Sequence, residues 1–168
     1  MSEVGVQIRS ALPRDVPRIA ELAGAHVADR RLLAKDLVTL YEDVQEFVVT
    51  ESAGQVVGAG ALHVMWADLG EIRSLVVDPA ARGRGVGAAL VASLMARARA
   101  LELRRLFCLT FEVAFFERLG FRPVEGPAVT PDIYEEMLRS HDDGVAEFLD
   151  LARVKPNTLG NTRMICDL

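Results

Sequence analysis

The feature that most constrains this chain is a run of glycine and arginine between an apolar stretch and a helical pattern. Asp78 and Pro79 end the apolar stretch, and apolar residues at helical spacing extend from the run to Leu101. A helix that begins at glycines presents unpaired backbone N–H groups and a positive partial charge. The run therefore predicts a phosphate-binding loop, to which two arginines add charge-assisted contacts. It reads Arg82-Gly83-Arg84-Gly85-Val86-Gly87-Ala88.

Two common phosphate-binding motifs do not describe this loop. The pattern Gly83-x-Gly85-x-x-Ala88 formally matches the dinucleotide fingerprint. In that motif, however, the first glycine directly ends a parallel strand, whereas here residues 78–82 intervene and the preceding strands form a meander. The run has no Gly-Lys-Ser/Thr element, which excludes a P-loop.

The remaining periodicity predicts one α/β domain with a mixed sheet. Alternating apolar residues predict strands over 4–8, 47–50, 56–65 and 72–77, with a hairpin turn at Ala53-Gly54. Helical spacing predicts a helix capped by Asp15, a second from Asp36 and a third over 85–101. Beyond it we expect a strand at 106–109, a short helix at 112–119, an extended segment at 121–124, a helix from Thr130-Pro131 and a closing strand at 163–168.

Composition narrows the functional classes. The chain has 168 residues, is 51% hydrophobic and carries a net charge of −5, which argues for a packed core and against nucleic-acid or anionic-membrane partners. Cys108 and Cys166 are isolated and predicted to be buried free thiols, and the scattered histidines offer no metal-site spacing. Neither a signal peptide nor a membrane span is indicated, so a soluble cytoplasmic protein is expected.

Two motifs together resemble a known family. Arg82-x-x-Gly85-x-Gly87 after Val-Val-Asp-Pro resembles the acyl-CoA-binding motif of the GCN5-related N-acetyltransferases (GNAT family). Phe115 to Phe121 resembles that family's short helix ending in Gly-Phe. The likeness covers nearly the whole chain. It implies a mixed central sheet of about seven strands flanked by helices, with splayed central strands, and acetyl-CoA as the acetyl donor.

A narrower likeness points to amino-acid acetyltransferases. The segments that carry it are Leu32 to Leu37, Glu46-Phe47, Gly70-Glu71-Ile72, Leu109-Thr110 and Phe116 to Phe121. They resemble the acetyltransferase domain of N-acetylglutamate synthases, most closely the short actinobacterial enzymes of arginine synthesis. This implies one acetyltransferase domain over residues 1–168, without the amino-acid-kinase-like domain of many synthases, acting on L-glutamate or L-glutamine.

The resemblance also implies roles in binding acetyl-CoA and in proton transfer. Backbone groups of Leu75, Val76 and Val77 would pair with pantetheine, and residues 82–88 would hold the pyrophosphate. Glu71, expected to open a strand, would act as general base for the acceptor amine, directly or through water, unless it is a solvated carboxylate. Phe116 replaces the tyrosine that often protonates the leaving thiolate. It then lines the pantetheine site or belongs to the core, and the general acid is water, Tyr41, Tyr134 or absent.

At the acceptor end, the resemblance implies that Lys35, with the backbone of Leu33, binds the acceptor's carboxylate. A solvated lysine is the alternative. Arg73 assists or only pairs with Glu71. Some related synthases carry an arginine before the closing strand, where this chain has Leu159. Asn157 and Asn161 lie nearby, and their mixed donors and acceptors suit an amide better than an anion, which favours glutamine.

Other functions stay open on the same fold: a non-catalytic acetyl-CoA sensor, or an acetyltransferase for another small amine or a protein N-terminus. No metal is expected. A homodimer and arginine feedback are left undecided by the sequence.

Overall fold

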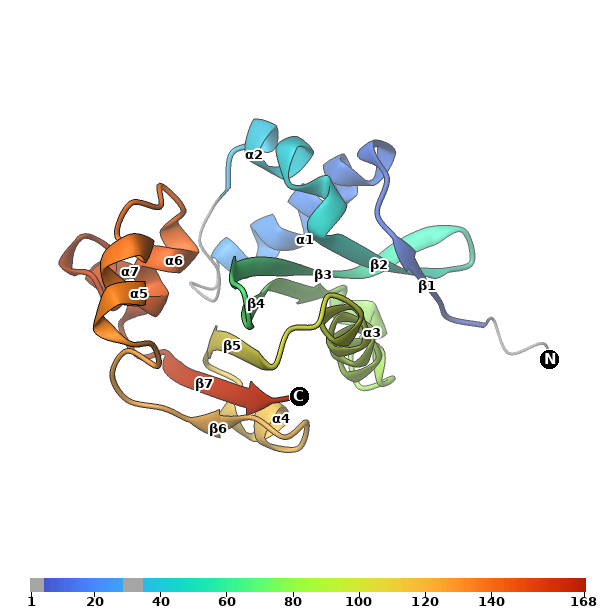
Figure 1. Cartoon of the computed structure of the whole chain (residues 1–168). Coiled ribbons are helices and arrows are strands. Elements are labelled where there is room, and N and C mark those ends of the chain that lie inside the picture. The colour runs from blue at the N-terminus through green and yellow to red at the C-terminus, as the bar shows by residue number, and fades with distance from the viewer. Residues whose placement is uncertain (1–4, 29–34) are drawn as a thin grey trace. The chain divides into compact units, whose positions relative to one another are not determined.

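The computed structural model describes residues 5–28 and 35–168, which form an α/β fold around a seven-stranded mixed sheet (Figure 1). The strand order is β1-β2-β3-β4-β5-β7-β6. The strands are β1 (Gln7–Ser10), β2 (Phe47–Ser52), β3 (Gln55–Trp66), β4 (Leu69–Val77), β5 (Arg105–Thr110), β6 (Arg122–Pro123) and β7 (Thr162–Asp167). The α-helices are α1 (Val16–Ala28), α2 (Leu37–Glu42), α3 (Val86–Ala100), α4 (Val113–Glu117), α5 (Pro131–Met137), α6 (Asp143–Phe148) and α7 (Lys155–Thr158).

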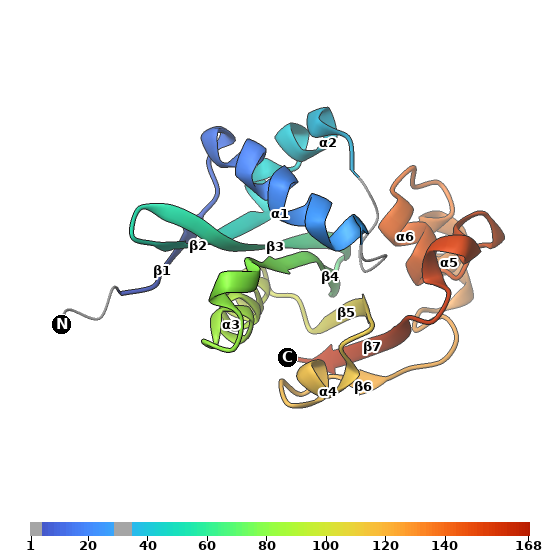
Figure 2. The same cartoon turned by 180° about the vertical axis from the view of Figure 1, so that it is seen from behind.

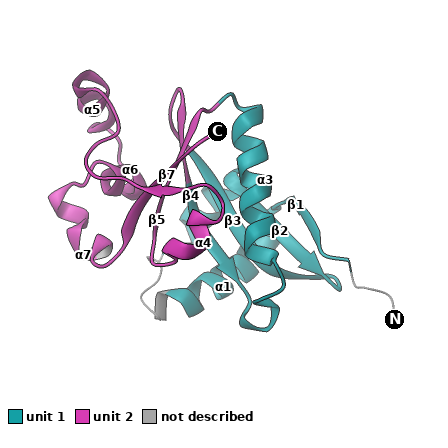
Figure 3. Cartoon of the chain, turned by 90° about the horizontal axis from the view of Figure 1, so that it is seen from below, with its two compact units in different colours: residues 1–63, 72–102 teal, residues 64–71, 103–168 magenta. Residues whose placement is uncertain are grey.

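The chain divides into two compact units that share two strands (Figure 3). Unit 1 holds the residues up to His63 together with 72–102, and unit 2 holds 64–71 and 103–168. β3 therefore leaves unit 1 after His63, and β4 leaves unit 2 after Glu71. The expected splay of the central strands concerns one unit relative to the other, and it stays a prediction.

In unit 1, β1, β2 and β3 pair antiparallel, and helices cover both faces of these strands (Figures 1 and 2). α1 and α2 lie over one face and α3 over the other. The helical spacing gives α1 and α2 one apolar face each, and the alternation of side chains gives the strands an apolar face. These apolar faces pack against each other. The main members of this core are Val16, Ile19, Leu22, Leu40, Phe47, Val49, Ala59, Ala61 and Val76.

On the α3 face, β3 presents glycines. A Cβ on Gly58 would lie 2.9 Å from Val86 Cγ1 and 3.0 Å from Leu90 Cδ1. A Cβ on Gly60 would lie 3.1 Å from both Leu75 Cδ1 and Leu94 Cδ1. The missing side chains let α3 approach the strand closely, and this brings the first turn of the helix against β3.

In unit 2, β4 pairs in parallel with β5 through Leu69–Glu71, and β7 pairs antiparallel with both β5 and β6. One face of these strands carries an apolar cluster in which the rings of Phe107 and Phe148 meet edge to face, with centroids 5.1 Å apart. Helices α5 and α6 contribute Met137, Val145 and Phe148 to this cluster. Cys108 and Cys166 are both buried and form no disulfide within the described residues, as predicted.

The structure confirms most of the predicted elements and corrects four points. The first strand, predicted over 4–8, is β1 at Gln7–Ser10, because pairing with residues 48–51 of β2 sets its bounds. β4 begins at Leu69, three residues before its predicted start, because its first residues are buried by pairing with β5. Asp15 does not cap α1. Its carboxylate accepts hydrogen bonds from Arg9 and from the N–H of Leu12, in a 3-10 turn before the helix. Helices α6 and α7 were not predicted, because both are too short for helical periodicity to be evident.

The glycine contact with α3 gives a stability prediction. Gly58→Ala forces the new methyl group against Val86 and Leu90, so we expect a loss of about 1–3 kcal/mol in the free energy of unfolding. The matched change Gly24→Ala, at an exposed position of α1 where a Cβ meets open space, should be neutral or stabilise by up to about 1 kcal/mol. Urea unfolding of both variants measures the difference. Equal stabilities would contradict the close approach of α3.

Candidate functional site

The phosphate-binding loop predicted from the sequence has the required backbone. Gly85 caps α3 with φ +77°, and Gly83 has φ +75°, both in the left-handed region that favours glycine. Helix geometry leaves the N–H groups of Val86, Gly87 and Ala88 without an acceptor inside α3. A Cβ at Gly83 or Gly85 would meet open space. These N–H groups therefore face a surface that an anion can approach.

The start of the loop is held rigidly by Asp78. Its carboxylate accepts from the N–H of Ala80 at 2.9 Å and from Arg18 Nη2 at 2.5 Å, while its own N–H donates to Val57 O at 2.8 Å. The hydrogen bond from Ala80 and then that from Arg18 lower the pKa of Asp78. Asp78 therefore stays ionised at neutral pH and keeps the chain in the turn that leads to Arg82.

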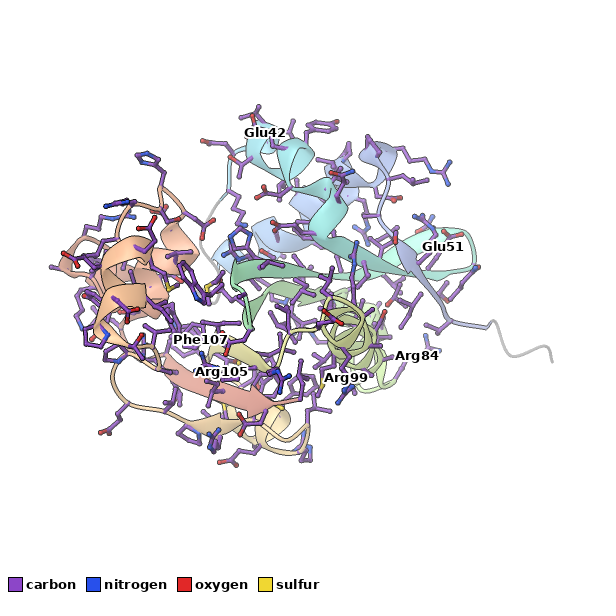
Figure 4. All side chains as sticks on the ribbon, viewed as in Figure 1. Glu42, Glu51, Arg84, Arg99, Arg105 and Phe107 are labelled. Atoms are coloured by element: carbon purple, nitrogen blue, oxygen red, sulfur yellow. The ribbon has the colours of Figure 1, made fainter. Side chains whose placement is uncertain are left out.

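Two exposed arginines complete the loop. Arg82 and Arg84 lie just before α3, and Arg84 projects from the loop (Figure 4). Val86 is buried and anchors the loop to the core of unit 1. A diphosphate needs several donors and compensating positive charge, and this loop offers backbone N–H groups and two guanidinium groups. The residues present thus fit the pyrophosphate of acetyl-CoA.

Ser74 is a feature of β4 that the sequence did not indicate. It has φ +55°, a left-handed conformation that costs a non-glycine residue roughly 1–3 kcal/mol. It interrupts the regular strand between Arg73 and Leu75, ahead of the residues proposed to meet pantetheine. Serine has no strong preference for this conformation, so no local signal was available.

Glu71 is placed differently from its predicted position. It is the third residue of β4, not its first, and only 4% of its surface is exposed. It stands in register with Phe107 of β5. Burial, and secondly the charge of Glu71, raises the pKa of the Cys108 thiol on β5, so Cys108 stays protonated. The solvated-carboxylate interpretation of Glu71 is therefore wrong.

Charged residues predicted to meet the acceptor gather in unit 1. Lys35 Nζ lies 3.9 Å from Asp43 Oδ2, with both side chains about one-quarter exposed, and so Lys35 is not a freely solvated lysine. Arg73 is half-buried and its charge acts on the same Asp43. His63 Nδ1 lies 2.6 Å from Glu46 Oε1. Leu33 lies outside the described residues.

Two basic residues near the C-terminal end of unit 2 already have interaction partners. Lys155 pairs with Asp150. Arg163 donates through Nη1 and Nη2 to the carbonyls of Glu147 and Phe148 at the end of α6, and its guanidinium lies 5.2 Å from the centre of the Phe107 ring. Burial lowers the pKa of Arg163 from its usual value.

The predicted amide-binding residues are on the same stretch. Asn161 is half-buried directly before β7, and Asn157 belongs to α7, although its side chain lies outside the description. Leu159, on the same stretch before β7, is 76% exposed.

The aromatic candidates for a general acid are also located. Phe116 is buried and packs edge to face on Phe115 and Phe121 within unit 2, which favours the core interpretation. Tyr134 packs against the apolar cluster of unit 2, and Tyr41 is 43% exposed on α2.

The described part of the chain shows neither a cluster of metal-ligating side chains nor a membrane-spanning helix. Residues 5–28 and 35–168 hold no cluster of three or more His, Cys, Asp or Glu suited to a metal ion. Over the same ranges, every helix is too short or too polar to cross a bilayer.

Comparison with known proteins adds to this geometry. Residues 17–121 match the acetyltransferase (GNAT) family. The chain is 56% identical over 161 residues to an amino-acid acetyltransferase of Mycobacterium tuberculosis, covering 94% of this chain and 92% of that protein. It is 34% identical over 122 residues to the Neisseria meningitidis amino-acid acetyltransferase, covering 71% of this chain but 28% of that longer protein.

Two solved structures agree with this result. The crystal structure of Rv2747 from Mycobacterium tuberculosis in complex with CoA and NLQ superposes with a TM-score of 0.94 at 55% identity, covering 96% of this chain and 99% of that one. The N-acetylglutamate synthase of Neisseria gonorrhoeae complexed with coenzyme A and N-acetyl-glutamate superposes with a TM-score of 0.77 at 26% identity, covering 99% of this chain and 36% of that one.

Proposed function

This chain belongs to the GNAT acetyltransferase family and is an amino-acid N-acetyltransferase that uses acetyl-CoA, and from that premise we propose that its acceptor is L-glutamate or L-glutamine. The reaction forms an amide at the α-amine and releases CoA. The observation that carries the proposal is the glycine–arginine loop that opens α3, in a chain whose relatives are named amino-acid acetyltransferases. The proposal extends to the first step of arginine biosynthesis, carried out in the cytoplasm.

Residues 82–88 hold the pyrophosphate in this proposal. Arg82 and Arg84 supply charge, and the N–H groups of Val86 to Ala88 supply fixed donors. Backbone groups of Leu75, Val76 and Val77 bind the pantetheine amides, which Ser74 helps to orient through its left-handed conformation. When bound, acetyl-CoA supplies a thioester carbonyl that an amine can attack.

Glu71 is the proposed general base. An amino acid's α-amine is mostly protonated at neutral pH and attacks only after it loses a proton. The buried Glu71 accepts this proton, directly or through one water molecule. A thiol has a pKa near 8.5, so the departing thiolate needs little acid catalysis and the lack of a tyrosine at Phe116 is tolerated.

Lys35 and Arg73 bind the acceptor's α-carboxylate. The charges of both residues act on the half-buried Asp43 of unit 1, and a desolvated carboxylate needs such a cation as its partner. At the other end of the acceptor, Lys155 and Arg163 are already engaged by Asp150 and by two carbonyls. This engagement favours an uncharged amide beside Asn161 over a second carboxylate.

The acceptor is tested by thiol release from acetyl-CoA with a panel of free amino acids. We expect turnover with L-glutamine and L-glutamate, with kcat/KM for glutamine at least equal to that for glutamate. A hundredfold preference for glutamate would overturn the amide argument and identify Arg163 or Lys155 as the cation for the second carboxylate. Turnover restricted to amines without a carboxylate would overturn the acceptor class.

The phosphate-binding loop gives a second prediction. Arg82→Ala removes a charged contact to phosphate and should weaken acetyl-CoA binding about tenfold or more, as measured by calorimetry. Arg99→Ala, which changes an exposed arginine in the last turn of the same helix (Figure 4), serves as the control and should bind normally. Equal affinities for the two variants would remove Arg82 from the site.

The general base gives a third prediction. Glu71→Gln keeps the shape of the side chain but cannot accept the proton, so kcat at pH 7 should fall about 10²–10⁴-fold with little change in acetyl-CoA affinity. The deficit should shrink as pH rises, because more of the amine is already deprotonated. Glu125→Gln, on an exposed loop, should be unaffected. Normal turnover at pH 7 would make Glu71 structural.

A further inference from the structure

Arg18 of α1 connects that helix to the start of the phosphate-binding loop. α1 lies on the face of the unit 1 strands opposite α3, the helix into which the loop leads (Figures 1 and 2). Arg18 Nε donates to Val56 O at 3.1 Å, and its Nη2 donates to Asp78 Oδ2 at 2.5 Å. The side chains of Arg18 and Asp78 are 30% and 24% exposed, so the pair is partly shielded from water. The third contact of Arg18, Nη1 with Glu21 Oε2 at 3.0 Å, lies at the surface, where Glu21 is 70% exposed.

The first residues of β3 support both ends of the loop. At the start of the loop, the Asp78 N–H donates to Val57 O at 2.8 Å. At its end, Val86 lies so close to Gly58 that an added Cβ would stand 2.9 Å from Val86 Cγ1. Residues 82–85, between these two contacts, are exposed. The position of the loop therefore depends on how its two ends are held.

Arg18 fixes the Asp78 side chain relative to β3. The guanidinium group is planar and presents its donors in a fixed fork, so it sets the separation of Val56 O and Asp78 Oδ2. The other carboxylate oxygen of Asp78 accepts from the Ala80 N–H at 2.9 Å, within the 3-10 turn that ends at Arg82. A displacement of Asp78 would therefore move Arg82, the first residue proposed to meet phosphate.

We propose that Arg18 is a positioning residue for acetyl-CoA, because its hydrogen bonds to Val56 and Asp78 hold the loop in the conformation that binds the pyrophosphate. This inference rests on the proposed role of residues 82–88 as the pyrophosphate site. Arg18 acts through Asp78 and needs no contact with the ligand. Since such coupling is reciprocal, bound CoA must stabilise the contact between Arg18 and β3 by the same factor.

A substitution that conserves charge tests this geometry. Arg18→Lys keeps the positive charge, but one ammonium group cannot span Val56 O and Asp78 as the guanidinium fork does. The Kd for CoA, measured by calorimetry, should rise about threefold to tenfold, as for a residue that acts on a ligand through another group. Arg14→Lys, at an exposed arginine in the 3-10 turn before α1, is the matched control and should bind as the wild type does. Equal affinities for the two variants would overturn the proposal.

Steady-state kinetics separate positioning of the loop from a general loss of structure. In Arg18→Lys the KM for acetyl-CoA should rise severalfold. The kcat at saturating acetyl-CoA and the KM for the amino acid should stay close to their wild-type values, because the reacting groups are not displaced once the cofactor is bound. A fall in kcat with an unchanged KM for acetyl-CoA would contradict the proposal.

A double-mutant cycle assigns the effect to the contact with Asp78. Asp78→Asn keeps an oxygen for the Ala80 N–H but loses the charge with which Arg18 pairs. In this background, Arg18→Lys should weaken CoA binding less than about twofold, because the two residues act as one unit. An Arg18→Lys effect of full size in the Asp78→Asn protein would overturn this route. Glu21→Gln removes only the exposed partner of Arg18 and should leave the Kd for CoA unchanged.

A measurement on the unmodified protein covers the case in which a variant fails to fold. Hydrogen exchange of the Arg18 Nε–H, followed by NMR, reports how often its bond to Val56 O opens. By linkage, saturating CoA should slow this exchange about threefold to tenfold, the factor expected for the Kd. The Arg9 Nε–H, which donates to Glu51 Oε2 at 2.9 Å in the same unit, is the control and should exchange equally fast with and without CoA. An exchange rate of Arg18 that CoA leaves unchanged would overturn the proposal.

Arg82→Ala separates failure of this inference from failure of the proposed pyrophosphate site. If Arg82→Ala and Arg18→Lys both bind CoA normally, the role of residues 82–88 and the role of Arg18 are both overturned. If Arg82→Ala weakens binding and Arg18→Lys does not, only the role of Arg18 is overturned. The expected result is weakened binding in both variants, with normal binding in Arg14→Lys.

Discussion

The close packing of α3 on the glycines of β3 is the contact on which the phosphate-binding loop depends. Gly58 leaves room for Val86 and Leu90, and Val86 is the first residue of the helix. The same contact that buries α3 therefore fixes the position of its first turn, where the N–H groups are uncovered. Asp78 fixes the other end of the loop through Ala80 and Arg18. The dipole of α3 and the two loop arginines can act on the same phosphate only if both ends of the loop are fixed.

Strand β4 belongs to both units and carries two of the candidate site residues. Glu71 belongs to unit 2 and Arg73 to unit 1, although they are two residues apart on one strand. The left-handed Ser74 follows at once and changes the course of the backbone before the residues assigned to pantetheine. Such a costly conformation in mid-strand is most easily understood at a functional position.

The predictions that succeeded depended on local physics. The loop was evident because glycine, arginine and the following helical period are adjacent in the sequence, and the fold followed from periodicity and family resemblance. The predictions that failed depended on which partner a side chain or strand meets, and the local pattern does not specify that partner. Asp15 was assigned to a helix cap, but Arg9 and the N–H of Leu12 occupy its carboxylate. Glu71 was expected at an open strand end, but β5 pairs with the start of β4 and buries it.

By itself, the sequence predicted the phosphate-binding loop and the mixed α/β fold from neighbouring residues: the φ angles open to glycine, the free N–H groups of a first helical turn and the repeat of apolar side chains. The candidate base and cations came instead from the resemblance to a known family. Only the tertiary structure decided which charges meet. His63 and Glu46 are 17 residues apart, and Arg163 reaches the end of α6 from 15 or 16 residues away. Pairing energies between such groups depend on burial and separation, and neither is encoded in any local stretch of the chain.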